Sequence, residues 1–376
     1  MNVFKKSKLI LLVATLMVMA LLAVGCGGGE EAADTAAEPQ NEKMKVGFIY
    51  VGSPGDAGWT YSQEEGRKYL EEHLDYVDAS YIMENVPEGA SSESYIQQLV
   101  QEGCEVIFTT SFGYMDATLA VAEKNKDLTF MHCSGFKTSD NMGNYFGRMY
   151  QARYLSGMVA GQHTENNLIG YVAAHPIPEV VRGINAFTLG VKAVNPDAKV
   201  KVLWTNTWYD PVKEKDAAKA LLDEGCDVIA QHQDTPGPMQ AAEEKGVYGV
   251  GYNTDMSKMA PKAVLTSPVW NWGPYYVEVV EAVKNGTWQP ESYWGGLEDG
   301  IVALAPYGPM VSEETKQLVE AKKQEIVDGK WDVFTGPIKD QHGNVKIAEG
   351  QKMTDQELLE FDWFVEGVEG SIPKQN

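Results

Sequence analysis

The sequence predicts an α/β protein made of two similar lobes, each built on a parallel β-sheet with helices on its faces. Three observations support this prediction. The chain has 376 residues, which is enough for two domains of ordinary size. From Lys45 onward, short apolar runs alternate with helical patterns, as in parallel sheets flanked by helices. A segment of the first half also recurs in the second half, shifted by 122 residues from Gly103 to Gly225.

The repeated segment is a helix that ends at a glycine and is followed at once by a buried strand. Residues 99–107 resemble residues 221–229 in this way, and each glycine is expected to adopt a left-handed C-cap conformation. At nearly the same spacing, the strand pattern of residues 46–49 is answered by residues 169–172. We therefore predict a first lobe of residues 44–164 plus about 295–376, and a second lobe of residues 165–294.

The individual elements follow the same alternation along the chain, with strands at apolar runs and helices at amphipathic ones. In the first lobe we expect strands at 46–51, 106–110 and 129–131, and helices at 61–70 and 117–123. In the second lobe we expect strands that begin near 169, 201, 228 and 248. Residues 301–306 are expected to return to the first lobe, and residues 337–347 to form a hairpin that turns at 342–344.

The first 25 residues have the pattern of a bacterial lipoprotein signal peptide. Lys5, Lys6 and Lys8 precede an apolar stretch that is too short for a comfortable bilayer span, and small residues lead to Cys26. We expect lipid attachment at Cys26, which would anchor the chain to the cell membrane, at its outer face or in the periplasm. An uncleaved amino-terminal anchor helix is the alternative, and both place the globular part outside the cytoplasm. Residues 26–43 are acidic and rich in alanine, as in a flexible tether.

The charge balance excludes some classes of partner. The chain has 31 Lys and Arg against 53 Asp and Glu, a net charge of -22, so binding to a nucleic-acid polymer or an anionic lipid face is disfavoured. Loss of residues 1–25 removes three Lys and no acid, giving -25, which also disfavours phosphorylated nucleotides. Cys104, Cys133 and Cys226 form no CxxC pair, so we expect buried thiols and neither a disulfide framework nor a cysteine zinc site.

Candidate ligand-binding residues lie in the loops that follow the predicted strands, because open parallel sheets bind ligands at the carboxyl ends of their strands. These loops carry aromatic rings together with amide, hydroxyl and carboxyl groups, a combination that suits a flat, neutral heterocycle with exocyclic N–H donors. The candidates are Trp59, Thr60, Phe112, Tyr114, Ser134, His175, Asn206, Trp208, Gln233, Asp234, Asn253 and Asp255. For Trp59, packing on its own helix is the alternative role.

Two other kinds of site are weakly indicated. The glycine-rich loop 52–60 is not GxGxxG and lacks the P-loop lysine, which argues against a nucleotide-phosphate site. The chain has no GxSxG or HExxH motif, and a hydrolase-like pairing of His175 or His232 with Asp234 or Asp255 stays open as a minor alternative. We expect no enzymatic activity, no cofactor and no metal.

The sequence resembles the basic membrane protein (BMP) family, the lipoprotein substrate-binding components of ABC importers that typically bind purine nucleosides. The resemblance covers nearly all of residues 44–370. It is carried by 45–50, 55–59, 107–116, 153–157, 177–183, 208–211, 272–276 and 334–340. It implies a periplasmic-binding-protein type I fold, with two Rossmann-like lobes that are joined by three hinge strands and close on the ligand. It also implies an ABC permease as the membrane partner, and we expect the protein to be a monomer.

The resemblance further implies a base sandwiched between Trp59 and Trp208 in the cleft between the lobes. Thr60 stands where the family usually has Asn, and Asn253 and Asp255 lie in the segment that supplies an acidic contact. Two departures concern the ribose. Trp270 lies in a stretch where nucleoside-binding relatives carry a Lys that reaches the ribose, and Ser134 stands where an Asp is common.

Loss of ribose-directed polar groups and gain of indole volume favour a free purine base, adenine first. The alternatives are a purine nucleoside (adenosine, inosine or guanosine) bound for import, a ligand sensor for a membrane signalling receptor and, last, an extracellular nucleosidase.

Overall fold

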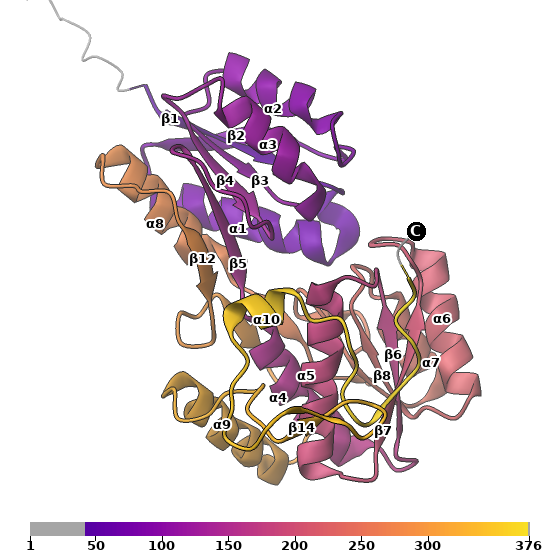
Figure 1. Cartoon of the computed structure of the whole chain (residues 1–376). Coiled ribbons are helices and arrows are strands. Elements are labelled where there is room, and N and C mark those ends of the chain that lie inside the picture. The colour runs from indigo at the N-terminus through magenta and orange to yellow at the C-terminus, as the bar shows by residue number, and fades with distance from the viewer. Residues whose placement is uncertain (1–41, 375–376) are drawn as a thin grey trace, which may run out of the picture. The chain divides into compact units, whose positions relative to one another are not determined.

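The computed structural model of the protein describes residues 42–374, which contain two six-stranded sheets (Figure 1). Every strand pair within these two sheets is parallel. The predicted α/β class with two parallel sheets is confirmed. The predicted signal peptide, the lipid-carrying Cys26 and nearly all of the tether lie outside the described residues.

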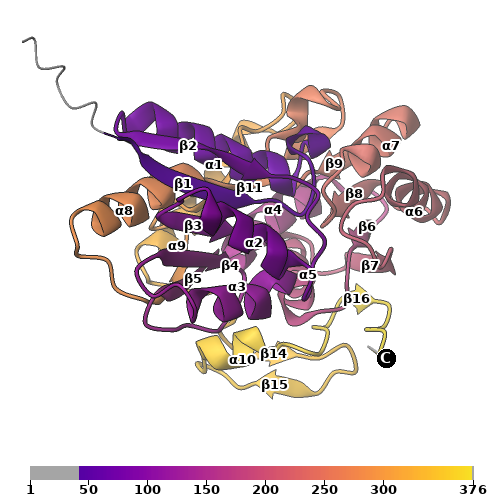
Figure 2. The same cartoon turned by 90° about the horizontal axis from the view of Figure 1, so that it is seen from above.

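The first sheet has the strand order β2-β1-β3-β4-β5-β12. Its strands are β1 (Met44–Ile49), β2 (Val77–Met83), β3 (Val106–Thr109), β4 (Thr129–Cys133), β5 (Met142–Gly147) and β12 (Ser292–Gly295). Figures 1 and 2 show that helices cover both faces of this sheet. One face carries α2 (Ser92–Gln101) and α3 (Met115–Ala122), and the other carries α1 (Trp59–His73) and α8 (Trp272–Lys284). The inner strands β3 and β4 are buried along their whole length, which explains why they read as continuous apolar runs.

The second sheet has the strand order β10-β9-β8-β6-β7-β16. Its strands are β6 (Leu168–Ala173), β7 (Lys199–Trp204), β8 (Val228–Gln231), β9 (Tyr248–Val250), β10 (Val264–Thr266) and β16 (Val368–Glu369). Its helices are α4 (Met149–His163), α5 (Pro178–Val194), α6 (Pro211–Asp223) and α7 (Gly237–Lys245), and α9 (Glu313–Val327) packs on α4. The predicted glycine caps are confirmed, since φ is +86° at Gly103 and +97° at Gly225.

Within residues 42–374 the chain crosses between the two sheets three times, as expected for a three-strand hinge. The first crossing is Arg148, between β5 and α4. The second crossing contains β11 (Pro268–Trp270) and the third contains β13 (Val302–Leu304), which pair as an antiparallel ribbon. We call these three segments the hinge crossings.

The structure differs from the predicted division into lobes. Helix α4, expected in the first lobe, packs on α5 beside the second sheet. Conversely, α8 and β12, expected in the second lobe, pack on α1 and pair with β5 in the first sheet. Helices α4 and α8 change sides because each directly follows a hinge crossing, and β12 follows α8 before the chain reaches the third crossing.

The carboxy-terminal segment, expected in the first lobe, lies on the second. Strand β16 pairs with β7, and α10 (Asp355–Leu359) packs on α5, beside which Figure 1 shows this segment in yellow. Arg182 on α5 donates to the Leu358 carbonyl at 2.6 Å, and Asn185 donates to the Trp363 carbonyl at 2.8 Å. The predicted hairpin is confirmed, as β14 (Ile338–Lys339) and β15 (Val345–Ile347) pair antiparallel.

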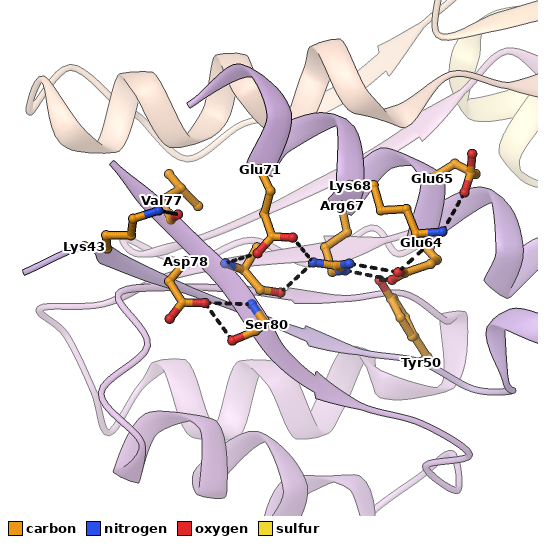
Figure 3. A network of polar contacts seen from close by, with 11 residues as sticks. Lys43, Tyr50, Glu64, Glu65, Arg67, Lys68, Glu71, Val77, Asp78 and Ser80 are labelled. Carbon is orange, nitrogen blue, oxygen red and sulfur yellow. Dashed lines mark hydrogen bonds and ion pairs between the residues drawn. The ribbon is translucent and has the colours of Figure 1, made fainter. Parts of the chain in front are cut away.

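Helix α1 is fixed to the first sheet by a polar network centred on Arg67 (Figure 3). The guanidinium of Arg67 donates to both carboxylate oxygens of Glu64, at 2.7 and 2.8 Å, and to the Glu71 carboxylate at 2.5 Å. It also donates to the Ala79 carbonyl on β2 at 3.2 Å, and the Tyr50 hydroxyl donates to Glu64 at 3.2 Å. The network sets the position of α1, whose first residue is the candidate ligand contact Trp59.

Replacement of Arg67 by methionine should lower the free energy of unfolding by about 3–5 kcal/mol, because the buried Glu64 carboxylate loses its partner. Lys68→Met is the matched control on the same helix. Lys68 is half exposed and its ion pair with Glu65 lies at the surface, so the loss there should stay below about 1 kcal/mol. Urea unfolding of both variants measures the difference, and equal losses would contradict the structural role of Arg67.

Candidate functional site

Trp59 is held at the start of α1 by the loop that follows β1. The Asp56 carboxylate accepts from the backbone N–H groups of Gly58, Thr60 and Tyr61 at 2.8–2.9 Å, which caps the helix. Burial raises the pKa of Asp56 above its ordinary value, although these N–H groups act in the opposite direction. The Trp59 indole N–H donates to the Thr110 carbonyl at the end of β3, at 2.7 Å. Its ring is therefore fixed at the carboxyl ends of two adjacent strands.

Four aromatic rings meet at this point, and we call them the tryptophan cluster: Trp59, Phe146, Trp270 and Trp272. The Trp59 ring lies edge-on to Trp270 and Trp272, with centroids 5.7 Å away in both cases. Trp270 stacks on Trp272 at 4.5 Å with the ring planes 15° apart, and Phe146 lies 5.0 Å from Trp270. Trp59 and Trp270 are singled out in the sequence analysis, but Phe146 and Trp272 are not named there as site residues. The sequence pattern that could have indicated them is an aromatic residue near the end of a strand, as for Phe146, or just after a hinge crossing, as for Trp272.

A chain of hydrogen bonds leads from this cluster to a buried carboxyl group. The Trp270 indole N–H donates to Asn253 Oδ1 at 2.9 Å, and Asn253 Nδ2 donates to Asp234 Oδ1 at 2.9 Å. Asp234 is only 7% exposed, and burial raises its pKa well above the ordinary value, with the Asp56 and Glu214 carboxyls adding to the effect. The Asn253 amide and the Trp59 backbone N–H act in the opposite direction. Asp234 is thus a buried carboxyl group that takes part in hydrogen bonding.

The strand-end loops of the two lobes touch beside Asp234. A Cβ atom at Gly58 would lie 2.1 Å from the Asp234 carbonyl oxygen, so the two backbones meet without room for a side chain. Thr254 Oγ1 donates to the Ala57 carbonyl at 2.5 Å. The lobes are therefore closed on each other along this edge.

A second group of rings belongs to the second lobe. The Trp208 ring lies 4.7 Å from His175 and 5.9 Å from His232, and His232 lies 4.9 Å from Tyr252. Burial lowers the pKa of His175. Trp208 adjoins the carboxyl site through its backbone, because its carbonyl accepts from the Asp234 N–H at 3.4 Å. Trp59 and Trp208 thus lie in the two loops that border Asp234, one from each lobe.

The hydrolase-like pairing of a histidine with Asp234 or Asp255 does not form. His232 Nε2 lies 2.9 Å from Glu179 Oε2, and Asp255 is exposed and caps a short 3₁₀ turn by accepting from the Ser257 N–H. The structure therefore gives Asp255 a local structural role.

The remaining candidates are placed as follows. Tyr114 is fully buried in the first lobe and donates its hydroxyl to the Val86 carbonyl at 2.6 Å, so it belongs to the core. Thr60 is buried beside Asp56, and Ser134 donates to the carbonyl of its neighbour Cys133. Phe112 and Asn206 are exposed on strand-end loops, whereas Gln233 is buried and donates to Thr205 Oγ1 at 2.8 Å.

Other kinds of site find little support in residues 42–374. No group of three or more His, Cys, Asp or Glu side chains in this range is arranged to hold a metal ion. Cys104, Cys133 and Cys226 are free and buried, and burial raises the pKa of Cys226 to about 11. None of the helices in this range has the length and apolar character needed to cross a membrane.

Two parallel-sheet lobes, three hinge crossings and a site at the strand ends define a type I periplasmic-binding-protein fold. Solved structures agree with this fold. An ABC transporter solute-binding protein from Aeropyrum pernix superposes with a TM-score of 0.68 at 19% identity, covering 84% of this chain and 97% of that one. One from Conexibacter woesei gives 0.64 at 23% identity, covering 77% and 98%.

The family follows from the sequence comparisons. The Bmp family model, described as ABC transporter substrate-binding protein PnrA-like, matches residues 43–333, and the chain belongs to this family of binding proteins. A purine-binding protein of Brucella abortus is 46% identical over 334 residues, which cover 89% of this chain and 95% of that protein. A Haloferax volcanii protein, named as a candidate ABC transporter glucose-binding protein, is 42% identical over 92% of this chain and 85% of its own. The protein is thus a substrate-binding protein of an ABC transporter.

Proposed function

We propose that the protein captures a purine base, adenine first, for an ABC importer. The observation that carries this proposal is the buried Asp234 carboxyl placed beside the tryptophan cluster at the edge where the two lobes meet. The purine-binding relative at 46% identity supports the same ligand class.

The chemistry of these groups matches a neutral, flat heterocycle. Aromatic side chains stack on bases for about 1–3 kcal/mol per ring. A carboxylate accepts from the exocyclic amino group or a ring N–H, and such a bond is stronger than a neutral one. The net charge of -22 disfavours the approach of a phosphate group, which favours a base or a nucleoside over a nucleotide.

The position of Trp270 favours the base over the nucleoside. Trp270 is 7% exposed, packs on Trp272 and lies beside the hinge at Gly147, so its large indole leaves less room there for a ribose than a smaller side chain would. Its only hydrogen-bonding group, the indole N–H, is already used by Asn253. A side chain in this state offers packing surface to a ligand and no polar contact to a sugar.

A sugar is the second candidate ligand, because of the name carried by the Haloferax relative. Mass spectrometry of the purified full-length protein under native conditions, followed by release of any co-purified molecule, separates the candidates. We expect the mass of adenine. Release of a hexose would favour the second candidate, and release of a nucleoside would overturn the choice of a free base.

We also infer that the mature chain is tethered to the outer side of the cell membrane through a lipid on Cys26. This inference rests on the sequence of residues 1–26. A Cys26→Ala variant should leave the membrane fraction, whereas Cys104→Ala, which changes a buried thiol, should stay with it. Fractionation of expressing cells measures this, and membrane retention of Cys26→Ala would contradict lipidation.

A further inference from the structure

We propose that Asn253 is a positioning residue that ties the ligand-recognising carboxyl of Asp234 to the hinge through Trp270. This inference rests on the proposed function, because it takes Asp234 as the group that accepts a hydrogen bond from the purine. It departs from the expectation that Asn253 itself contacts the ligand.

Both polar atoms of the Asn253 side chain are hydrogen-bonded inside the protein. Its oxygen accepts from the Trp270 indole N–H and its nitrogen donates to Asp234, both at 2.9 Å, and the residue is 1% exposed. Its backbone is engaged as well, since its carbonyl accepts from the Trp270 N–H at 3.2 Å. The backbone of Asn253 has φ of +67°, a left-handed conformation that Asn adopts more readily than most residues. Position 253 thus needs this backbone shape, one acceptor and one donor, and Asn supplies all three.

The partner of Asn253 on the other side, Trp270, belongs to the hinge. It ends β11 in the second crossing, where β11 pairs with β13 of the third. It also lies beside the first crossing, since a Cβ at Gly147, the residue before Arg148, would lie 2.6 Å from Trp270 Cζ3 and 2.6 Å from Val302 Cγ1. The three crossings are therefore in close contact around one indole ring, and opening of the hinge has to carry that ring with it.

Two hydrogen bonds connect the hinge to Asp234. Trp270 holds Asn253, Asn253 holds Asp234, and Asp234 lies against the loop of the first lobe at Gly58 and Trp59. A ligand that donates to Asp234 stabilises the arrangement in which the indole keeps its bond to Asn253. Binding and hinge position are then coupled through the Trp270 indole and through Asn253, whose side chain does not touch the ligand.

The Asn253→Asp variant tests the hydrogen-bonding role of Asn253, because a residue that only fills space would not make binding depend on pH. The carboxyl introduced by Asn253→Asp keeps an acceptor for Trp270 but has no N–H for Asp234. One proton shared between the two carboxyls restores the bridge, and loss of that proton leaves two like charges in contact. The other titratable groups that face Asp234 are Asp56 from the β1 loop, Glu214 from α6 and Tyr252 after β9. The Asp56 and Glu214 carboxyls further disfavour the doubly charged pair.

The experiment is calorimetric titration of adenine into the full-length protein from about pH 5 to about pH 8.5, the range in which such a carboxyl pair releases its shared proton. Asn253→Asp should bind close to wild type at the acid end and at least about tenfold more weakly at the alkaline end. Wild-type affinity should stay level or rise with pH, because the ligand prefers the ionised Asp234. Asn253→Ala should bind weakly throughout, with no recovery in acid.

The outcomes separate the two proposals. Absence of purine binding by the wild type would overturn the proposed function and this inference together. If the wild type binds adenine tightly, either of two results would overturn the inference alone. One is that Asn253→Asp follows the wild-type pH profile, and the other is that Asn253→Ala binds adenine as tightly as the wild type. If the Asn253 variants fail to fold, Trp270→Phe decides, since it keeps a ring but removes the N–H. We expect it to weaken adenine binding by about three- to tenfold, and unchanged affinity would overturn the inference.

Discussion

Replacement of Gly58 by alanine is expected to weaken ligand binding by at least about a hundredfold while leaving the free protein folded. The added Cβ would lie 2.1 Å from the Asp234 carbonyl oxygen and 2.6 Å from its Cα, and both are backbone atoms that cannot move aside cheaply. Overpacking of this kind costs about 3 kcal/mol, and every 1.4 kcal/mol is tenfold in affinity. Because the collision is between lobes, opening of the hinge relieves it, so the cost falls on the closed, ligand-binding form.

Gly55→Ala is the matched control in the same loop. The nearest atom that its Cβ would meet is Ser53 Oγ at 3.9 Å, so affinity should be unchanged. Titration calorimetry measures affinity, and small-angle scattering with and without ligand measures closure. If Gly58→Ala binds the ligand as tightly as the wild type does, closure at this contact is not needed for binding.

Replacement of Trp59 by alanine should weaken purine binding at least tenfold, which agrees with a stacking contribution of about 1–3 kcal/mol per ring. The ring is half buried, lies edge-on to Trp270 and Trp272, and is oriented by its bond to the Thr110 carbonyl. A base stacked on Trp59 would lie at the edge that Asp234 shares with the Gly58 loop. Loss of the ring therefore removes the contact from the first lobe while Asp234 stays in place.

Tyr61→Ala serves as control, because Tyr61 lies two residues further along α1 and is 38% exposed. In the absence of ligand, both variants should melt within a few degrees of the wild type, which corresponds to a change of about 1 kcal/mol in the free energy of unfolding. Equal affinity of Trp59→Ala and Tyr61→Ala would remove Trp59 from the ligand site.

Much of the fold is predictable from the sequence because its signals are local. Strands buried on both faces give apolar runs, and helices that end at Gly103 and Gly225 give the repeat that indicates two lobes. Membership of the lobes is not local. Asn144 pairs with Ser292, and Val200 pairs with Val368, each more than 140 residues away, and no nearby pattern records such pairings. The assignments of α4, α8, β12 and the carboxy-terminal segment failed for this reason.

The candidate site shows the same limit at the level of side chains. Sequence position indicates that Trp59, Asp234 and Asn253 follow strands, and the structure brings these three together. It does not indicate where a side chain points. Tyr114 also follows a strand but turns into the core because its hydroxyl meets the Val86 carbonyl. Phe146 enters the tryptophan cluster from the end of β5 without any motif to mark it.

Parallel titrations of the full-length protein with adenine, adenosine and glucose test whether the site takes a free purine base. In the proposed site, Trp270 is buried beside the hinge, and Asp234 would accept a hydrogen bond from an N–H donor of the ligand. Adenine should therefore bind with an affinity at least about tenfold higher than adenosine, a difference of about 1.4 kcal/mol, and glucose should give no heat of binding. Tight binding of adenosine or glucose without binding of adenine would contradict the claim.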